Sequence, residues 1–282
     1  MSILSIQSNV VAGHVGNSAA GPALQRLGYT VWRLDTVHFS NHPAHGHHTG
    51  RVVAASAIAD LVEGLDRRGI FGDCEAAISG YLGDAATGPV VIDAVDRVRR
   101  QRPDALYLCD PVIGDHGERY VRDGLEPFFR DAAVPAADIV TPNPFEAECL
   151  TGQPVASVDD ALRACDSLRT MGPAMAVVTG VERNGEISIV GTTDEAAWIV
   201  TTPKVSAERF GAGDLFAALL LGRYLQDRRL DTAIAAAASA VHGVLVLAAK
   251  TGARDLPLIA AQDLLVNPPR DFPAEKLRQE FN

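Results

Sequence analysis

The chain has 282 residues, of which 47% are hydrophobic and 21% charged, a composition typical of a folded globular protein and not of a disordered one. Its formal net charge of −10 argues against nucleic acid or an anionic membrane as the main partner. No Gly-Lys dipeptide occurs in the chain, which excludes a phosphate-binding loop of the Walker type.

Short apolar segments alternate with helical patterns through the first two thirds of the chain. The predicted strands are 3–7, 30–34, 76–79, 105–109, 139–141 and 176–179. The predicted helices are 17–27, 56–68, 85–100, 144–151 and 158–171, with Ser56, Asn143 and Ser157 as N-caps. This alternation indicates βαβ units and predicts an α/β fold with a mostly parallel central sheet flanked by helices on both faces.

The pattern changes after residue 179. Residues 186–190 and 197–201 are typical of an antiparallel pair, and two helices are expected from Ala212 and from Asp231. Residues 232–249 carry no charge, but polar residues and glycine interrupt the run, which favours a buried helix over a membrane span. No composition shift marks a linker, so we expect a single domain over 1–282.

Cysteine spacing and the N-terminal residues bear on location. The four cysteines lie at least 16 residues apart, so no Cys-x-x-Cys metal or redox pair can form locally. The first residues lack the basic start and the long apolar run of a signal peptide. Both observations favour a reducing cytoplasm.

The tetrapeptide Gly211-Ala212-Gly213-Asp214 opens the first of the two late helices. Glycines let the backbone approach a ligand, and the free N–H groups of a first helical turn attract anions. A carboxylate there repels a phosphate unless a proton or a metal joins it. The tetrapeptide alone is compatible with a plain helix start or with an anion site, and Phe216 stands where a dinucleotide fingerprint needs a third glycine.

Acidic residues follow two neighbouring predicted strands. Asp110 and Asp115 come after the fourth strand, and Glu146 opens the helix after the fifth. Ligands of open α/β sheets bind at the carboxyl ends of the strands, where these acids are expected to meet. They could hold Mg²⁺ together with phosphates and water, or each could cap its own loop.

Taken together, these segments resemble the ribokinase-like superfamily of small-molecule kinases and, within it, the pyridoxal kinases, over nearly the whole chain. Segments 110–115, 141–148 and 211–216 resemble motifs shared across the superfamily. Segments 4–8 with 13–20, 37–42 and 79–83 are narrower and resemble the pyridoxal kinases in particular. The resemblance implies ATP-dependent phosphorylation of the 5′-hydroxyl of pyridoxal by a homodimer.

The resemblance also implies roles for individual residues. Asp214 would accept the proton of the 5′-hydroxyl, while the amides of Gly211, Ala212 and Gly213 hold the γ-phosphate. Asp115 and Glu146 would serve Mg²⁺, mainly through water. The nucleotide would contact Asp110, Tyr120, Asn143, Thr179, Gly180 and Phe210, and the pyridine substrate would contact Ser8, Val15, His42, Pro43, His48 and Tyr81. Whether a monovalent cation such as K⁺ assists the nucleotide stays open.

The segment after the second strand departs from the family pattern. The family continues Asn-His with threonine and places an aromatic residue a few positions later, whereas here Pro43 follows His42 and His48 takes the aromatic position. Five histidines between His38 and His48 invite a metal hypothesis, but no acid or cysteine lies among them and no zinc spacing fits, which favours a substrate lip. Two alternatives remain: a hydroxymethylpyrimidine kinase or other ribokinase relative, and a pyridoxal-binding protein of low turnover.

Overall fold

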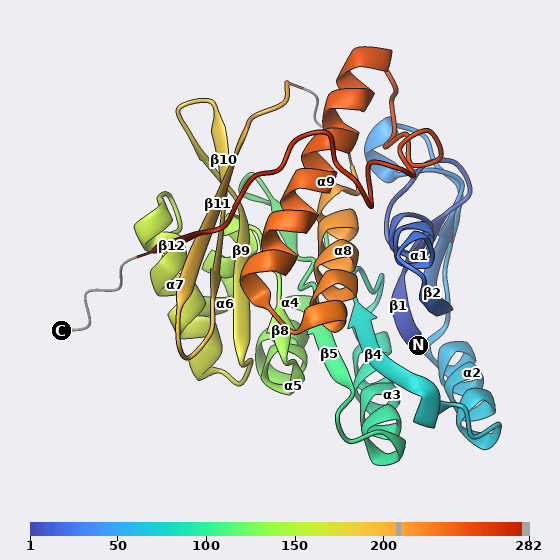
Figure 1. Ribbon diagram of the computed structural model, residues 1–282. Coiled ribbons are helices and arrows are strands. Elements are labelled where there is room, and N and C mark those ends of the chain that lie inside the picture. The colour runs from blue at the N-terminus through green and yellow to red at the C-terminus, as the bar shows by residue number, and fades with distance from the viewer. Residues whose placement is uncertain (207–209, 278–282) are drawn as a thin grey trace.

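The computed structural model describes residues 1–206 and 210–277, and within these ranges ten strands form one sheet (Figure 1). The strand order is β12-β11-β10-β9-β8-β5-β4-β1-β2-β3. In chain order these are β1 Ser2–Val10, β2 Thr30–Phe39, β3 Gly50–Val52, β4 Cys74–Ser79, β5 Leu106–Cys109, β8 Ile139–Val140, β9 Met175–Arg183, β10 Glu186–Thr192, β11 Ala197–Pro203 and β12 Glu275–Leu277. The six strands from β9 to β2 run parallel, and antiparallel strands close both edges.

Helices cover both faces of the sheet, as predicted. One face carries α1 (Asn17–Arg26), α8 (Ala212–Asp227) and α9 (Leu230–Thr251), and Figure 1 shows α8 and α9 packed against each other. The other face carries α2 (Ala55–Arg67), α3 (Gly88–Gln101), α4 (Leu125–Phe128), α5 (Val134–Ala136), α6 (Pro144–Thr151) and α7 (Val158–Thr170). Successive strand residues alternate between the two layers: Leu108 packs with α8 and α9, while Tyr107 and Cys109 pack with α3.

Helix α9 is the single helix in the described part of the chain that is long and apolar enough to cross a membrane. Half of its apolar window is buried, against α8, β10 and β11. A further contact fixes its outer side, because Phe272 from the C-terminal segment donates its N–H to Ser239 at 2.9 Å. The helix therefore serves the core of this fold, as the sequence predicts.

Several boundaries differ from the sequence prediction. Asn143 and Ser157 cap α6 and α7 as predicted, but Ser56 is not a cap, because α2 begins at Ala55 without a side-chain capping bond. The helical stretch 125–136 and the edge strands β3 and β12 were not predicted. Strand β9 continues beyond 179 to Arg183, because its second half pairs with β10 through a bulge.

A buried amide ties the first loop to the sheet. Asn17, at the start of α1 and fully buried, donates to the carbonyl oxygens of Gln7 and Leu34 and to Asp35 Oδ1 (3.3, 3.1 and 2.7 Å). Its Oδ1 accepts from Ser5 Oγ at 2.7 Å. A buried amide with every hydrogen bond made has one favourable orientation, so Asn17 fixes where the loop between β1 and α1 leaves the sheet.

Candidate active site

Two loops meet at the carboxyl edge of the sheet, and each opens a helix. Gly211, the N-cap of α8, has φ +89°, and a Cβ there would lie 2.1 Å from the carbonyl oxygen of His14. Only glycine permits both that conformation and that approach. Asp214 lies in the first turn of α8, and its carboxylate accepts a hydrogen bond from the backbone N–H of Gly16, the N-cap of α1. The first turn of α8 therefore faces the β1–α1 loop, and Asp214 joins the two.

Two more carboxylates are buried at the same edge. Asp110, at the end of β5, is 6% exposed and accepts a hydrogen bond from Thr141 Oγ1 at 2.8 Å. Glu146, 4% exposed, forms a capping box with Asn143 and accepts from the N–H groups of Ile113 (3.0 Å) and Asn143 (2.9 Å). The Thr141 hydroxyl thus holds Asp110, and backbone N–H groups hold Glu146, each in a fixed position.

These three carboxylates lack a cationic partner among the described residues. Within residues 1–206 and 210–277 none of Asp110, Glu146 and Asp214 forms an ion pair. Burial and the charge of Asp214 raise the pKa of Asp110 to about 7. Burial, and next the charge of Asp110, raise the pKa of Glu146 well above its ordinary value, and burial raises that of Asp214. A bound cation would relieve this mutual repulsion.

The donor set fits Mg²⁺ bound largely through water. In the described residues no three His, Cys, Asp or Glu side chains converge into a closed metal cage. Mg²⁺ typically keeps several waters and binds one or two carboxylates together with substrate phosphates. Glu146 is buried at the edge, and Asp115 is exposed on the hairpin of β6 (Gly114–Asp115) and β7 (Glu118–Arg119), close enough that, beside burial and Asp110, its charge also raises the pKa of Glu146.

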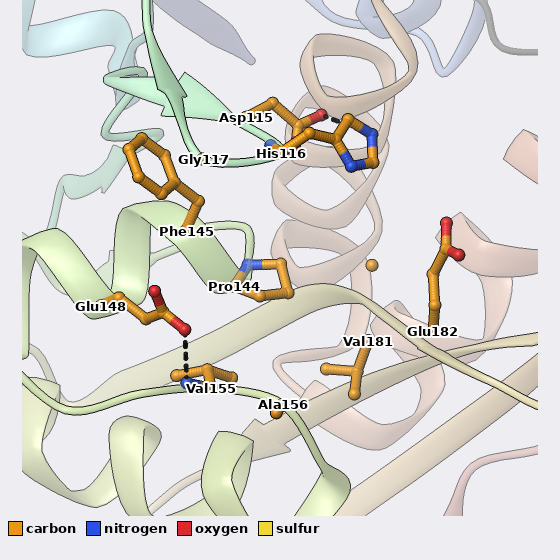
Figure 2. A pocket seen from close by; sticks show the side chains of 11 residues that line it. Asp115, His116, Gly117, Pro144, Phe145, Glu148, Val155, Ala156, Val181 and Glu182 are labelled. Atoms are coloured by element: carbon orange, nitrogen blue, oxygen red, sulfur yellow. Dashed lines mark hydrogen bonds and ion pairs between the residues drawn. The ribbon is translucent and has the colours of Figure 1, made fainter.

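A cavity of about 350 Å³ lies beside these acids, between the β6–β7 hairpin, the start of α6 and the β9 bulge. Figure 2 shows Asp115 and His116 above it, Pro144 and Phe145 along one wall, and Glu182 opposite. Gly180, with φ +77°, lies in the bulge and lines the cavity. Thr179 precedes Gly180 and donates its N–H to the carbonyl of Pro142 at 3.0 Å, and Tyr120, 56% exposed, follows β7. Of the predicted nucleotide residues, Gly180 lines the cavity itself, and Thr179 and Asn143 adjoin the lining residues Gly180 and Pro144.

The predicted substrate residues Ser8, Val15 and Tyr81 lie at or after the ends of β1 and β4, at the carboxyl ends of the parallel strands. Ser8 is buried at the end of β1, and the left-handed Gly16 packs so closely that a Cβ there would lie 2.3 Å from Ser8 Oγ. Val15 is buried in the same loop. Tyr81 follows β4, half-buried, and its carbonyl accepts from Thr36 Oγ1 at 2.7 Å.

The lip, residues 40–49 between β2 and β3, carries the remaining predicted substrate residues. His42 caps a short turn formed by Pro43–His45, and its ring stacks on Phe210 with centroids 4.1 Å apart. His48 packs on Phe39 at 5.1 Å. Phe210 was predicted to contact the nucleotide; the structure places its ring on the lip, because His42 and His45 both contact it there.

Sequence reasoning missed two groups at this site. The first is the backbone N–H of Gly16, the hydrogen-bond partner of Asp214. A glycine in a loop gives no sequence signal of such a contact. The second is Asp255, in the segment after α9, whose carboxylate lies 3.0 Å from His45 Nε2. No motif surrounds Asp255, so only the folded chain reveals its place.

Comparison with known proteins agrees with this geometry. Residues 70–258 match the phosphomethylpyrimidine kinase family. A pyridoxal kinase PdxY from Rubrobacter xylanophilus is 47% identical over 283 residues, covering 98% of each chain, and one from Deinococcus radiodurans is 42% identical, covering 98% of this chain and 96% of that one. A pyridoxal kinase from Leishmania donovani in complex with ADP and pyridoxine superimposes with a TM-score of 0.94 at 26% identity, covering 98% of this chain and 99% of that chain.

Fold and site together define a ribokinase-like small-molecule kinase. The sequence identity of 47% and 42% to pyridoxal kinases, over nearly the whole chain, identifies the family within that class. The chain belongs to the pyridoxal kinase family.

The charge at Asp110 predicts a pH-dependent stability effect. Its folded pKa of about 7 exceeds the ordinary value of 3.8, so the folded state binds more protons and stability falls as pH rises between these values. Asp110→Asn keeps the acceptor for Thr141 and removes the charge. We expect the variant to gain unfolding free energy over the wild type, and more at pH 8 than at pH 5, in chemical denaturation. Asp73→Asn, at an exposed carboxylate, is the control, and a gain independent of pH would contradict the assignment.

Proposed function

We propose that this protein transfers the γ-phosphoryl group of ATP to the 5′-hydroxyl of pyridoxal, giving pyridoxal 5′-phosphate and ADP. The observation that carries the proposal is the placement of Asp214 in the first turn of α8, hydrogen-bonded to the N-cap of α1, at the sheet edge where Ser8, near the end of β1, and the loops with Tyr81 and Asn143 also lie. We propose that a hydroxyl held by Ser8 and Tyr81 meets, beside Asp214, a phosphate held near Asn143 and Gly180. The pyridoxal kinase relatives support the choice of substrate.

Each step of the transfer has a group suited to it. The Asp214 carboxylate, with its pKa raised by burial, can accept the proton of the attacking hydroxyl. The N–H groups of Gly211, Ala212 and Gly213 would bind the γ-phosphate oxygens as charge develops, because no side chain caps the first turn of α8. Phosphoryl transfer depends mainly on positioning and charge neutralisation, which such oriented donors supply.

Mg²⁺ would be held by Glu146 and Asp115, mainly through water, and would neutralise the phosphates when bound. Asp110 would support it from the floor of the site, where Thr141 holds its carboxylate. Two buried polar atoms beside the substrate side, Gln7 Oε1 and His14 Nδ1, have no partner among the described residues. A ligand or ordered water would satisfy them, which supports a binding site here.

Assembly and location follow from the family resemblance and from the cysteines. We expect a homodimer by resemblance to the pyridoxal kinases. A cytoplasmic location fits the free cysteines, of which Cys74, Cys109 and Cys165 are buried.

A coupled assay of ADP release distinguishes the candidate functions. The proposal predicts turnover with pyridoxal, measured beside pyridoxine, pyridoxamine and hydroxymethylpyrimidine. Turnover confined to hydroxymethylpyrimidine would identify the kinase of that substrate instead. Tight binding of pyridoxal in calorimetry without ADP release would identify a binding protein, and either result would contradict the proposed reaction.

Asp214→Asn distinguishes a base from a residue that only supports the start of α8. General-base catalysis contributes about 10²–10⁴-fold, so we expect kcat to fall at least ~100-fold while the dissociation constants of pyridoxal and ATP change only a few-fold. Asparagine keeps the size of the side chain and an acceptor for the Gly16 N–H, so a purely structural role predicts unchanged stability and turnover. A variant that keeps more than about a tenth of the wild-type kcat would remove Asp214 from the chemistry.

A further inference from the structure

The lip contacts Phe210, which directly precedes residues 211–213. These three residues, whose N–H groups are proposed to bind the γ-phosphate, are called the phosphate-binding loop below. The His42 ring lies nearly parallel to that of Phe210, at 4.1 Å and 14°, and the His45 ring meets the edge of Phe210 at 5.4 Å and 85°. Phe210 is 43% exposed, so its position depends largely on these two imidazoles. Stacked and edge-to-face ring pairs of this geometry contribute beyond the area they bury.

Asp255 joins the lip from the segment after α9. Its Oδ1 lies 3.0 Å from His45 Nε2, with the two side chains 38% and 27% exposed. The same carboxylate packs on the β1–α1 loop, where a Cβ at Gly13 would lie 2.8 Å from Oδ1. A cavity of about 220 Å³ borders this contact, lined by Ala12, Asn41, His45, Arg254 and Asp255. Asp255 thus contacts the lip and the β1–α1 loop together.

These contacts lead directly to the reacting groups. Phe210 is covalently followed by Gly211, whose backbone packs on the carbonyl of His14. His14 belongs to the loop whose Gly16 N–H binds Asp214. Movement of the lip away from Phe210 and Asp255 would therefore release one support of the loop that is to hold the γ-phosphate.

We propose that His45 and Asp255, together with the stack of His42 on Phe210, form a latch that couples closure of the lip over the pyridine substrate to the geometry of the phosphate-binding loop. Asp255 and His45 are positioning residues in this latch, because they act through Phe210 and the lip. The inference rests on the proposed kinase activity, which supplies both the substrate and the phosphate.

Polar and aromatic groups from two segments surround the latch. His45 faces Asp255 and Arg254 from the segment after α9, and His42 lies beside it in the lip, with His48 also close to His42. Burial, and next the neighbouring His45, lower the pKa of His42 to about 4, so His42 is neutral when it stacks on Phe210 at physiological pH. The stack on Phe210 is thus a contact between two uncharged rings, and the polar contact of the latch is the one between His45 and Asp255.

Steady-state kinetics of Asp255→Ala, compared with Asp255→Asn, test the latch. Asp255→Ala removes the partner of His45 Nε2, whereas Asp255→Asn keeps the shape of the side chain and a hydrogen-bond acceptor. We expect KM for pyridoxal to rise about two- to fivefold in Asp255→Ala, the range that a partly exposed polar contact supplies, and to return most of the way in Asp255→Asn. His45→Gln should raise KM at least as much as Asp255→Ala, because it also removes the ring contact with Phe210, and the double variant should raise it no further than His45→Gln.

Asp263→Ala is the matched control, because it removes an ion pair with Arg26 of α1 at 3.1 Å on the same C-terminal segment. We expect it to match the wild type. Wild-type kinetics for Asp255→Ala, or an equal loss in Asp263→Ala, would overturn the latch while leaving the proposed function intact. An inactive wild type would overturn the proposed function, and the latch with it.

Discussion

The uncompensated negative charge at the carboxyl edge of the sheet is the constraint on which the site depends. Asp110 and Glu146 are buried there and Asp214 is partly buried, without a cationic partner in the described ranges 1–206 and 210–277. Thr141, the α6 capping box and the Gly16 amide hold them in place against their repulsion. A fold that keeps unpaired buried carboxylates sacrifices stability, and such a cost is typical of a site where a ligand brings the missing charge.

The rest of the molecule positions partners for these acids. Parallel strands bring β1, β4, β5 and β8 to a common edge, so loops far apart in the chain converge. Asn17 fixes the exit of the first loop, and the β9 bulge brings Gly180 to the wall of the cavity. The proposed function assigns the phosphate donor to that side of the site and the acceptor to the side of Ser8 and Tyr81. Coupling between these sides through the lip would let the enzyme commit to transfer only when both are filled.

Sequence reasoning succeeds here where the deciding interactions are local. The βαβ alternation, the caps at Asn143 and Ser157 and the glycine-rich start of α8 follow from neighbouring residues, and the structure has all of them. Ser56 is not a cap because α2 begins at Ala55, which places Ser56 inside the first turn of the helix. Strand β12 and the position of Phe210 depend on tertiary contacts, which leave no periodic signal. The roles of the individual site residues stay predictions, supported by their convergence.

The number of protons released on nucleotide binding tests most directly whether a bound cation neutralises the buried acids. If Mg²⁺ with ADP settles beside Asp110, whose pKa is about 7, it favours the ionised carboxylate and expels the proton that the free protein holds. Titration calorimetry of Mg·ADP binding at pH 7, in two buffers of different ionisation enthalpy, counts these protons. The account predicts a net release, reduced in Asp110→Asn. Proton uptake, or no exchange at all, would contradict it.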